Sequence, residues 1–240
     1  MKKIETRIIP EETNLKFFME HLKPYEFLRN NAEGKNILEI GCGDGYGAAY
    51  LAQVALKVVG IDYEEEVVLK AQNKYKAPNL SFLSMDATEL QFQDNSFDIA
   101  CSFQVIEHIP EDQLLKYLQE IKRVLMKDGE SYLSTLNLDH VMKPHATYKK
   151  HPAHCKEFRL NELSDLLSSV FAKTKIFGLH LTPKHYFYLR LKKSGFFNFL
   201  PDSINPVSRY YSKITTDDFI ITSDNLRKSI DFVCTCKAQK

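Results

Sequence analysis

The chain has 240 residues, enough for one sizeable domain with elaborations and too few for two large ones. Its 32 Lys and Arg residues nearly balance its 31 Asp and Glu residues, so a formal net charge of +1 excludes a globally basic nucleic-acid binder. With 44% hydrophobic and 26% charged residues, and no apolar run near the ~20 residues of a spanning helix, the composition excludes a wholly disordered or membrane-embedded chain.

The predicted elements begin with one or two amphipathic helices over residues 11–31, broken at Pro24. From residue 36 onward, short apolar runs alternate with helical patterns. We predict strands at 36–41, 57–62, 80–86, 97–103 and 131–137, and helices at 48–55, 64–75 and 112–126. Strands separated by helices imply right-handed crossovers, and therefore an α/β fold with a mostly parallel, doubly wound sheet.

The remaining chain adds a helix at 160–171 and strands at 173–179 and 229–237. Between those last two strands, residues 183–215 form an insert with eight Phe and Tyr residues. The insert holds six Lys and Arg residues against the single acid Asp202, a local net charge of +5. One interpretation is an aromatic cap over the sheet with solvated lysines. The other is a surface for a phosphorylated acceptor or for a membrane.

The N-terminus and the cysteines indicate the compartment. Residues 1–14 have a basic start without the apolar run of a secretory signal, so we expect a cytoplasmic protein. The five cysteines are odd in number and lack the paired CxxC spacing of a zinc site. We therefore expect reduced thiols.

A glycine-rich loop follows the first predicted strand, with Gly41, Gly43, Gly45 and Gly47 in LEIGCGDGYG. Glycines there let the backbone turn sharply and approach a ligand at the carboxyl edge of the sheet. From Gly43 to Ala48 the spacing also satisfies the dinucleotide pattern GxGxxA, so a nicotinamide enzyme is an alternative.

Carboxylates near this loop favour a different cofactor. Asp44 within the loop and Glu39 before it would repel a pyrophosphate, whereas they would attract a cofactor with an amine and a sulfonium cation, such as S-adenosylmethionine. Asp62 ends the second strand, where its carboxylate can accept hydrogen bonds from ribose hydroxyls. Asp86 ends the third strand, where it can accept from an adenine amino group. Each acid alone would be read as a helix cap or a solvated loop residue.

Five segments together resemble class I S-adenosylmethionine-dependent methyltransferases of the type 11 kind, over about residues 30–137. They are LEIGCGDGYG, VVGIDY, MDATEL, FDIACSFQVIEHI and LMKDGESYLSTLN, with Asp128 where the family usually has Pro. The resemblance implies a Rossmann-like seven-stranded sheet of order 3-2-1-4-5-7-6 with strand 7 antiparallel. It also implies one methyltransferase domain over 1–240. That domain would comprise an N-terminal helical segment (1–34), a cofactor-binding half (35–137) and an acceptor-side half (138–240).

The same resemblance implies the cofactor contacts. The methionine portion of S-adenosylmethionine would lie against Glu39, Gly41, Cys42 and Gly43, and the ribose and adenine against Asp62 and Tyr63. Asp86 and Ala87 would flank the adenine ring, and Ser102, Phe103 and Gln104 would close over the methionine end. The product would be S-adenosylhomocysteine.

The flanks of the chain resemble a narrower group, small methyltransferases associated with glycan and cell-surface polysaccharide assembly. The segment HPAHCKEFRLNELSDLL (151–167) carries this likeness, and His151 and Ala153 depart from the group's usual pattern. The resemblance implies O-methylation of a sugar or glycan-related hydroxyl. An anionic acceptor, such as a nucleotide sugar or a lipid-linked saccharide, would suit the charge of the insert.

A hydroxyl acceptor must lose its proton during methyl transfer, which calls for a general base. The candidates are Glu107, His108 and His154, and we prefer His154 because it follows the fifth strand, where the acceptor should enter. The segment QVIEHI is also similar to metal-assisted methyltransferases of ubiquinone synthesis. There Gln104 replaces the first acid, so we predict no metal.

Several alternatives remain open from the sequence. The acceptor of an enzyme could be a quinone, a lipid or an amine. RNA is a less favoured acceptor, because the chain is neutral overall and TLNLDH (135–140) does not match the motif of exocyclic-amine DNA enzymes. A non-enzyme alternative is a regulatory module that binds S-adenosylmethionine. The sequence does not determine the oligomeric state.

Overall fold

The computed structural model describes residues 7–142 and 148–238. Its strands are β1 (Asn36–Ile40), β2 (Lys57–Asp62), β3 (Leu80–Ser84), β4 (Phe97–Phe103), β5 (Leu125–Leu136), β6 (Lys173–Leu181), β7 (Phe219–Thr222) and β8 (Asp231–Lys237). Its α-helices are α1 (Leu15–Arg29), α2 (Tyr46–Ala52), α3 (Glu65–Lys74), α4 (Leu114–Val124), α5 (Leu138–Val141), α6 (Leu160–Val170), α7 (Pro183–Ser194) and α8 (Pro206–Tyr211). Short 3₁₀ turns include η1 (Ile106–His108) and η3 (Thr216–Asp218).

All eight strands belong to one sheet of order β3-β2-β1-β4-β5-β8-β6-β7. The pairs from β3 through β5 are parallel, and β8 runs antiparallel to both β5 and β6. The predicted order is confirmed, with β6 as the predicted sixth strand and β8 as the seventh. The sequence pattern missed β7, a short antiparallel strand that pairs with β6 at the edge.

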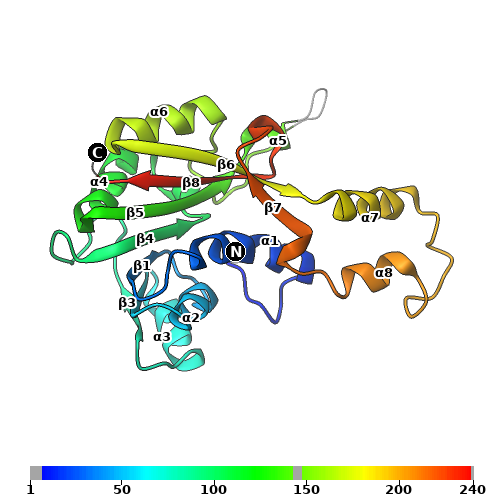
Figure 1. The fold of residues 1–240 in the computed structure, drawn as a ribbon, viewed down its shortest axis with the longest axis horizontal. Coiled ribbons are helices and arrows are strands. Elements are labelled where there is room, and N and C mark those ends of the chain that lie inside the picture. The colour runs from blue at the N-terminus through cyan, green and yellow to red at the C-terminus, as the bar shows by residue number, and fades with distance from the viewer. Residues whose placement is uncertain (1–6, 143–147, 239–240) are drawn as a thin grey trace.

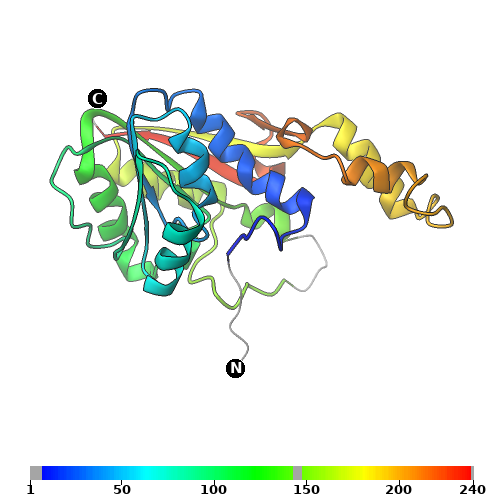
Figure 2. The ribbon, with the colours of Figure 1, turned by 90° about the horizontal axis from the view of Figure 1, so that it is seen from below.

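Helices cover both faces of the sheet, as Figures 1 and 2 show. Ile37 of β1 packs into a core with residues of α1, α2 and α3, whereas its neighbour Leu38 packs into the core shared with α4 and α6. Because successive side chains of a strand point to opposite faces, a strand covered on both sides is apolar at nearly every position. This explains the continuous apolar runs of the central strands.

The N-terminal helix α1 is a single helix with Pro24 inside it, so the break predicted at Pro24 is wrong. Asn14 caps its first turn by accepting hydrogen bonds from the backbone N–H groups of Lys16 and Phe17. Pro24 is buried with Tyr25 and the following turn, and this packing compensates for the hydrogen bond that proline cannot donate.

Residues 183–215 form an arm, comprising α7, α8 and the segment between them, that projects beyond the edge of the sheet in both views (Figures 1 and 2). The insert therefore does not cover the whole sheet, but Tyr188, Tyr210 and Tyr211 at its base pack against Leu179 and Val233 at the edge of the sheet, and its lysines are exposed, so the interpretation as an aromatic cap holds only there. All five cysteines of the chain are free. Within the described part of the chain, no helix combines the length and the apolar character needed to cross a bilayer.

The glycine loop after β1 offers a test of packing at the core of the fold. Gly45 has a φ of +93°, and an added Cβ would lie 2.9 Å from Cβ of Ala71 and from the ring of Phe82. Gly34 has a φ of +69°, but an added Cβ there would meet nothing within 4 Å. Gly34→Ala therefore measures only the cost of a left-handed backbone conformation for a residue with a Cβ. We expect it to lower the free energy of unfolding by about 1–2 kcal/mol.

Gly45→Ala adds overpacking to the same backbone strain, so we expect a further loss of about 1–3 kcal/mol. Urea unfolding of both variants beside the parent protein measures the difference. Equal losses in the two variants would contradict the close approach of the loop to α3 and β3.

Candidate cofactor and acceptor site

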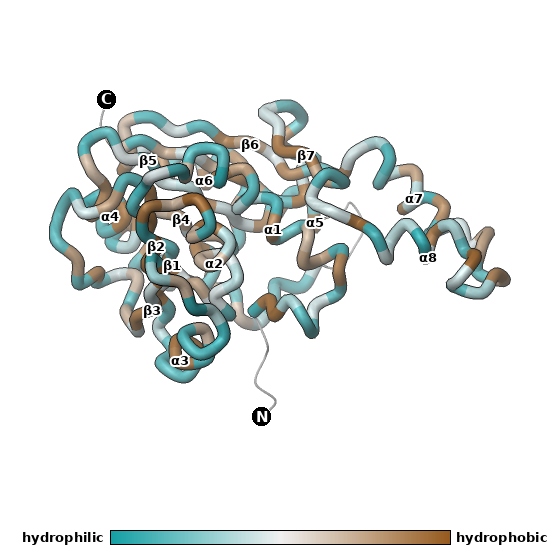
Figure 3. Tube along the Cα trace, turned by 60° about the horizontal axis from the view of Figure 1, so that its bottom comes forward, coloured by the Kyte–Doolittle hydropathy of each residue, from teal (hydrophilic) through white to brown (hydrophobic). Residues whose placement is uncertain are grey.

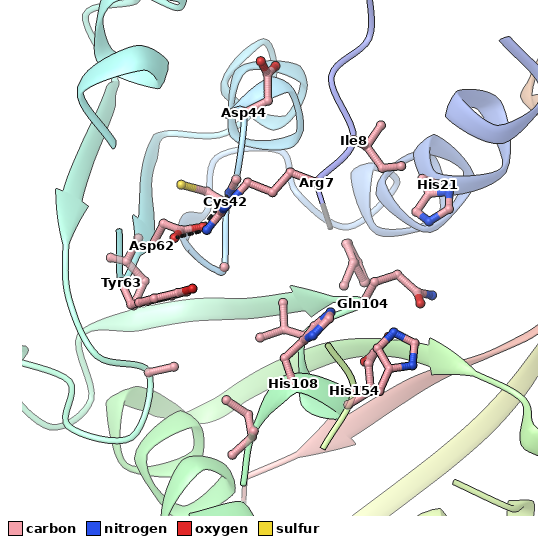
Figure 4. Close-up of a pocket in the computed structure, with 18 of the residues that line it drawn as sticks. Arg7, Ile8, His21, Cys42, Asp44, Asp62, Tyr63, Gln104, His108 and His154 are labelled. Atoms are coloured by element: carbon pink, nitrogen blue, oxygen red, sulfur yellow. Dashed lines mark hydrogen bonds and ion pairs between the residues drawn. The ribbon is translucent and has the colours of Figure 1, made fainter. Parts of the chain in front are cut away.

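A cavity of about 710 Å³ lies at the carboxyl edge of the parallel strands. It is next to the switch point between β1 and β4, where the strand order reverses and where open α/β sheets bind ligands. Its volume falls within the range of small-molecule sites. Figure 4 shows its two ends, with Cys42, Asp62 and Tyr63 at one and Gln104, His108 and His154 at the other.

Asp62, the last residue of β2, holds the first end of the cavity together. It is only 6% exposed, and its Oδ2 accepts a hydrogen bond from the N–H of Gly43 at 3.1 Å. Its Oδ1 accepts from the N–H of Glu64 at 3.1 Å and from Nη2 of Arg7 at 3.2 Å. Arg7 also forms an ion pair with Glu64 at 3.2 Å. Sequence reasoning missed Arg7, because a single arginine before the first helix follows no pattern.

Most of the cofactor contacts implied by the resemblance line this cavity. These residues are Gly41, Cys42, Gly43, Asp62, Tyr63, Asp86, Ala87, Phe103 and Gln104. Asp86 is exposed, and its Oδ1 accepts from the N–H and the hydroxyl of Thr88, so it also stabilises the turn after β3.

Glu39 and Ser102 do not line the cavity. Glu39 is 1% exposed and accepts a hydrogen bond from the Tyr25 hydroxyl at 2.5 Å. Burial raises the pKa of Glu39 to about 8, so this carboxyl is mostly neutral at pH 7. Ser102 donates to the carbonyl of Ile40 and accepts from the Tyr117 hydroxyl. In this geometry both residues fix α1, α4 and the strands around the cavity.

Asp44 contributes less negative charge to the cavity than the sequence suggests. Its carboxylate forms an ion pair with Lys74 at 2.8 Å and accepts from the Tyr75 hydroxyl at 2.8 Å. Figure 4 shows it pointing away from the other labelled residues. Asp62 is itself paired with Arg7 at 3.2 Å, so the electrostatic preference for a cationic cofactor depends on the partly compensated Asp62 and on Asp86.

The second end of the cavity forms where residues 151–157 dock against η1. The carbonyl of Glu107 accepts hydrogen bonds from the N–H groups of Cys155 at 2.7 Å and Lys156 at 3.1 Å. In return, Nδ1 of His108 lies 3.0 Å from the carbonyl of Ala153. These reciprocal bonds bring the rings of His108 and His154 to a centroid distance of 5.0 Å.

Hydrogen bonds fix the tautomers of both histidines. A carbonyl oxygen can only accept, so His108 carries its proton on Nδ1 and presents an unprotonated Nε2. Nδ1 of His154 lies 2.6 Å from Oε1 of Glu157, a residue that is only 8% exposed. Burial and the neighbouring imidazoles lower the pKa of His154 to about 4. His154 is thus neutral at pH 7, with an unprotonated Nε2.

Glu107 lies behind these two histidines. It is 1% exposed, its Oε2 accepts from the Thr135 hydroxyl at 3.0 Å, and burial raises its pKa to about 7. One ligand atom each of Glu107, His108 and His154 lies within 4.8 Å of the others, so these three residues could hold a metal ion. The prediction of no metal remains a prediction.

Sequence reasoning missed several polar residues of this end, among them Glu20 and His21 from α1 and Asp231 from β8. Asp231 is 8% exposed and accepts from Nε2 of Gln104 at 3.1 Å, and burial raises its pKa well above the usual range. The topology contained a signal for Asp231. A strand antiparallel to β5 must begin at the edge where β5 ends.

Comparisons with known proteins identify the fold and the cofactor class. Residues 38–133 match the family described as "Methyltransferase domain". A "probable S-adenosylmethionine-dependent methyltransferase" of Mycolicibacterium smegmatis is 34% identical over 153 residues, which are 64% of this chain and 58% of that protein. A protein of Mycobacterium tuberculosis with the same description is 32% identical over 169 residues, 70% of this chain and 60% of its own length. The chain thus spans somewhat under two thirds of the length of these relatives.

A more distant relative acts on a lipid. The phthiotriol/phenolphthiotriol dimycocerosates methyltransferase 1 of Mycobacterium ulcerans is 31% identical over 114 residues, 46% of this chain and 41% of that protein. Among solved structures, S-adenosylmethionine-dependent methyltransferases of Thermotoga maritima and Archaeoglobus fulgidus superpose with TM-scores of 0.62 and 0.61 at 16% and 15% identity. The superpositions cover 93% of this chain in both cases, and 93% and 94% of those chains. They show the Rossmann-like fold of this class.

The cofactor of this class is S-adenosylmethionine, and the cavity residues fit it. Gly41 has a φ of +74°, and an added Cβ would lie 2.5 Å from Val105, so the loop backbone itself forms the cavity wall. The Asp62 carboxylate lies beside this wall, where it can accept from ribose hydroxyls. Asp62, Asp86 and the backbone of Gly41 to Gly43 would hold the cofactor.

Replacing the Asp62 carboxylate tests this assignment. Because hydrogen bonds to a charged group contribute roughly 1.5–3 kcal/mol, we expect Asp62→Asn to raise the Kd of S-adenosylhomocysteine about 10- to 100-fold. Isothermal titration calorimetry measures the Kd, and a parallel Tm measurement shows that the variant is folded. Asp44→Asn is the matched control, since Asp44 pairs with Lys74. Equal effects of the two substitutions would contradict the role of Asp62.

Chelation tests the three residues that could bind a metal. Gln104 is neutral and Glu107 is partly protonated near pH 7 and bonded to Thr135, so we expect methyl transfer to be unchanged, within about twofold, after dialysis against EDTA. Turnover of S-adenosylmethionine before and after dialysis is the measurement. Loss of turnover that a divalent metal restores would contradict the prediction and assign the ion to Glu107, His108 and His154.

Proposed function

We propose that this chain, which carries a class I S-adenosylmethionine-dependent methyltransferase domain over residues 38–133, transfers a methyl group to a hydroxyl of a small-molecule acceptor. One observation carries the proposal. His154 presents an unprotonated Nε2 to the cavity, while its Nδ1 is anchored to the buried carboxylate of Glu157. A neutral imidazole oriented by a carboxylate is the arrangement of a general base.

The proposed chemistry divides between the cofactor and the protein. S-adenosylmethionine supplies an electrophilic methyl group, so the chain needs chiefly to position the reactants. His154 receives the proton of the acceptor hydroxyl on Nε2, and Glu157 stabilises the resulting imidazolium through Nδ1. The ring of His108 packs edge-on against the ring of His154 and limits its rotation. Because Nδ1 of His108 donates to the carbonyl of Ala153, its Nε2 is available to accept a hydrogen bond from a second hydroxyl of the acceptor.

The polar groups around His154 favour a polyhydroxylated acceptor, such as a sugar or a glycan-related molecule. Glu20, His21, Gln104 and Asp231 line the same part of the cavity and offer both donors and acceptors. A site built from such groups discriminates strongly against molecules that lack hydroxyls, because its buried polar groups would then be left without partners. An amine acceptor need only arrive neutral, so it would not require a base in the transfer step itself.

The lipid methyltransferase among the relatives supports a second acceptor class. A hydroxyl on a lipid or lipid-linked molecule would use the same base, with its apolar part against Phe17, Ile109 and Leu136. No residue of 183–215, all of which are described, lines the cavity, so the charge of the arm does not favour an anionic acceptor at this site.

Substitution of His154 tests the proposed base. Because general bases contribute typically 10²- to 10⁴-fold, we expect His154→Ala to lower kcat by that order, measured as S-adenosylhomocysteine formed with a panel of sugar, lipid, phenol and amine acceptors. His151→Ala is the matched control, since its ring lies 4.7 Å from that of His154 and His151 contacts Glu157 only through its backbone N–H, which the substitution keeps. Full turnover by His154→Ala with a hydroxyl acceptor would contradict the proposal, and absence of turnover by the parent protein with every acceptor would favour a regulatory module.

The pH profile distinguishes His154 from Glu107 as the base. A base must be unprotonated, so activity is present above its pKa and is lost as the pH falls through it. With a pKa of about 4 for His154, kcat/KM should be flat from pH 8 down to about pH 5 and then fall. An inflection near pH 7 would instead indicate Glu107, whose pKa is about 7.

A further inference from the structure

The arm formed by residues 183–215 has a defined structure at its base. The rings of Tyr188 and Tyr210 stack at a centroid distance of 4.0 Å with an angle of 7° between them. His185 is fully buried and contacts the rings of Tyr210 and Phe219. Asn205 caps α8 and donates from Nδ2 to the carbonyl of Phe197 at 2.9 Å, which ties the two helices together. The arm is therefore a packed extension of the edge of the sheet.

Beyond this base, the arm exposes large apolar side chains. Phe187 is 58% exposed, Phe196 66%, Phe199 76% and Ile204 58%. Figure 3 shows hydrophobic segments at the far tip of the arm, where the chain turns between α7 and α8. The exposure of three phenylalanines and an isoleucine to water on one projecting element is unfavourable. Exposed apolar patches of this kind mark interaction surfaces.

The same element is strongly cationic. All six Lys and Arg residues of the arm are exposed, against the single acid Asp202. Lys184 pairs with Asp218, and Lys192 lies over the ring of Tyr211. Within the described residues only Lys184 of the six forms an ion pair, and five have none, which are Arg190, Lys192, Lys193, Arg209 and Lys213. The arm thus combines exposed aromatic rings with uncompensated positive charge.

We propose that the tip of the arm docks on the surface of an anionic lipid bilayer. Aromatic side chains partition into the interface between head groups and acyl chains, and Lys and Arg nearby are attracted to anionic head groups. A single-stranded nucleic acid would also suit cations and aromatic rings, but it needs a groove that follows the backbone. The exposed apolar side chains of the arm are mostly phenylalanine, and Figure 3 shows hydrophobic segments at its projecting tip.

The helix α1 connects this tip to the cavity. Met19 packs against the core at the base of the arm, and Nζ of Lys16 lies 6.0 Å from the ring centroid of Phe219. On the next turn of the same helix, Glu20 and His21 line the acceptor end of the cavity. The docking surface goes beyond the proposed function and does not depend on it.

Sedimentation with sucrose-loaded vesicles tests the docking surface on the whole protein. We expect the protein to bind vesicles of phosphatidylglycerol and phosphatidylcholine, to bind vesicles of phosphatidylcholine alone much more weakly, and to be released from the former by added salt. Phe196→Ser with Phe199→Ser should weaken binding about tenfold or more, because two buried aromatic contacts are lost. Arg190→Glu with Lys193→Glu should weaken it and remove most of the salt dependence.

Leu56→Ser with Leu115→Ser is the matched control, because these two exposed leucines lie on the body of the molecule, and its binding should equal that of the parent protein. Tm values show that each variant is folded, and S-adenosylhomocysteine binding should be the same in all of them. Failure to bind anionic vesicles, or equal binding by the Phe196→Ser/Phe199→Ser variant and the control, would overturn the proposal. Tighter binding of a single-stranded RNA that vesicles cannot displace would also overturn it.

Discussion

Four parallel strands, β1, β2, β3 and β4, end at the same edge of the sheet, and the rest of the site depends on this constraint. The connections return the chain to the opposite edge of the sheet before each new strand, so these strands run parallel and the residues that follow them meet at one edge. The glycine loop, Asp62 and Asp86 are thereby brought around one cavity although more than 40 residues separate the first from the last. Strand β8 joins them from the opposite direction, because an antiparallel neighbour of β5 begins where β5 ends, and Asp231 reaches the same cavity.

The division of the cavity into two chemically different ends follows from what docks on this edge. At the first end, backbone N–H groups and Arg7 surround the Asp62 carboxylate. At the second, the backbone of residues 153–156 binds the backbone and ring of η1, which places the proton of His108 on Nδ1, whereas the side chain of Glu157 orients His154 through its Nδ1. Neutral imidazoles with free Nε2 atoms suit proton transfer, whereas the acids at the other end suit a cationic ligand. The near-neutral net charge of the sequence is thus the sum of unlike regions. Near the cavity Lys74 compensates the carboxylate of Asp44, and the positive charge of the arm lies away from the cavity.

Local patterns in the sequence predicted a mostly parallel sheet, the glycine loop after β1 and the acids at strand ends, whereas the order of the sheet and most of the cavity wall were implied by the resemblance to class I methyltransferases. The orientation of Glu39 was not predicted. In the structure strand alternation places residue 39 on the same face as Ile37, so its side chain points towards Tyr25 and not into the cavity. Arg7, Glu20 and His21 were missed because they reach the cavity from an N-terminal segment and a helix whose position depends on packing over long distances. The pairing of His108 with His154 was equally hidden, since the bonds that create it are made by backbone groups. The base of the arm is held by contacts between distant residues, such as the stacked rings of Tyr188 and Tyr210 and the buried ring of His185, that composition alone cannot reveal.

The central claim is that the edge of this sheet binds a cationic, phosphate-free nucleoside cofactor, although the glycine spacing also satisfies the dinucleotide pattern. Isothermal titration of the whole protein with S-adenosylhomocysteine and, separately, with nicotinamide adenine dinucleotide tests this claim most directly. The account predicts saturable binding of S-adenosylhomocysteine with a Kd at least about 100-fold lower than that of the dinucleotide, since the acids at the cavity disfavour a pyrophosphate. Equal or tighter binding of the dinucleotide would contradict it.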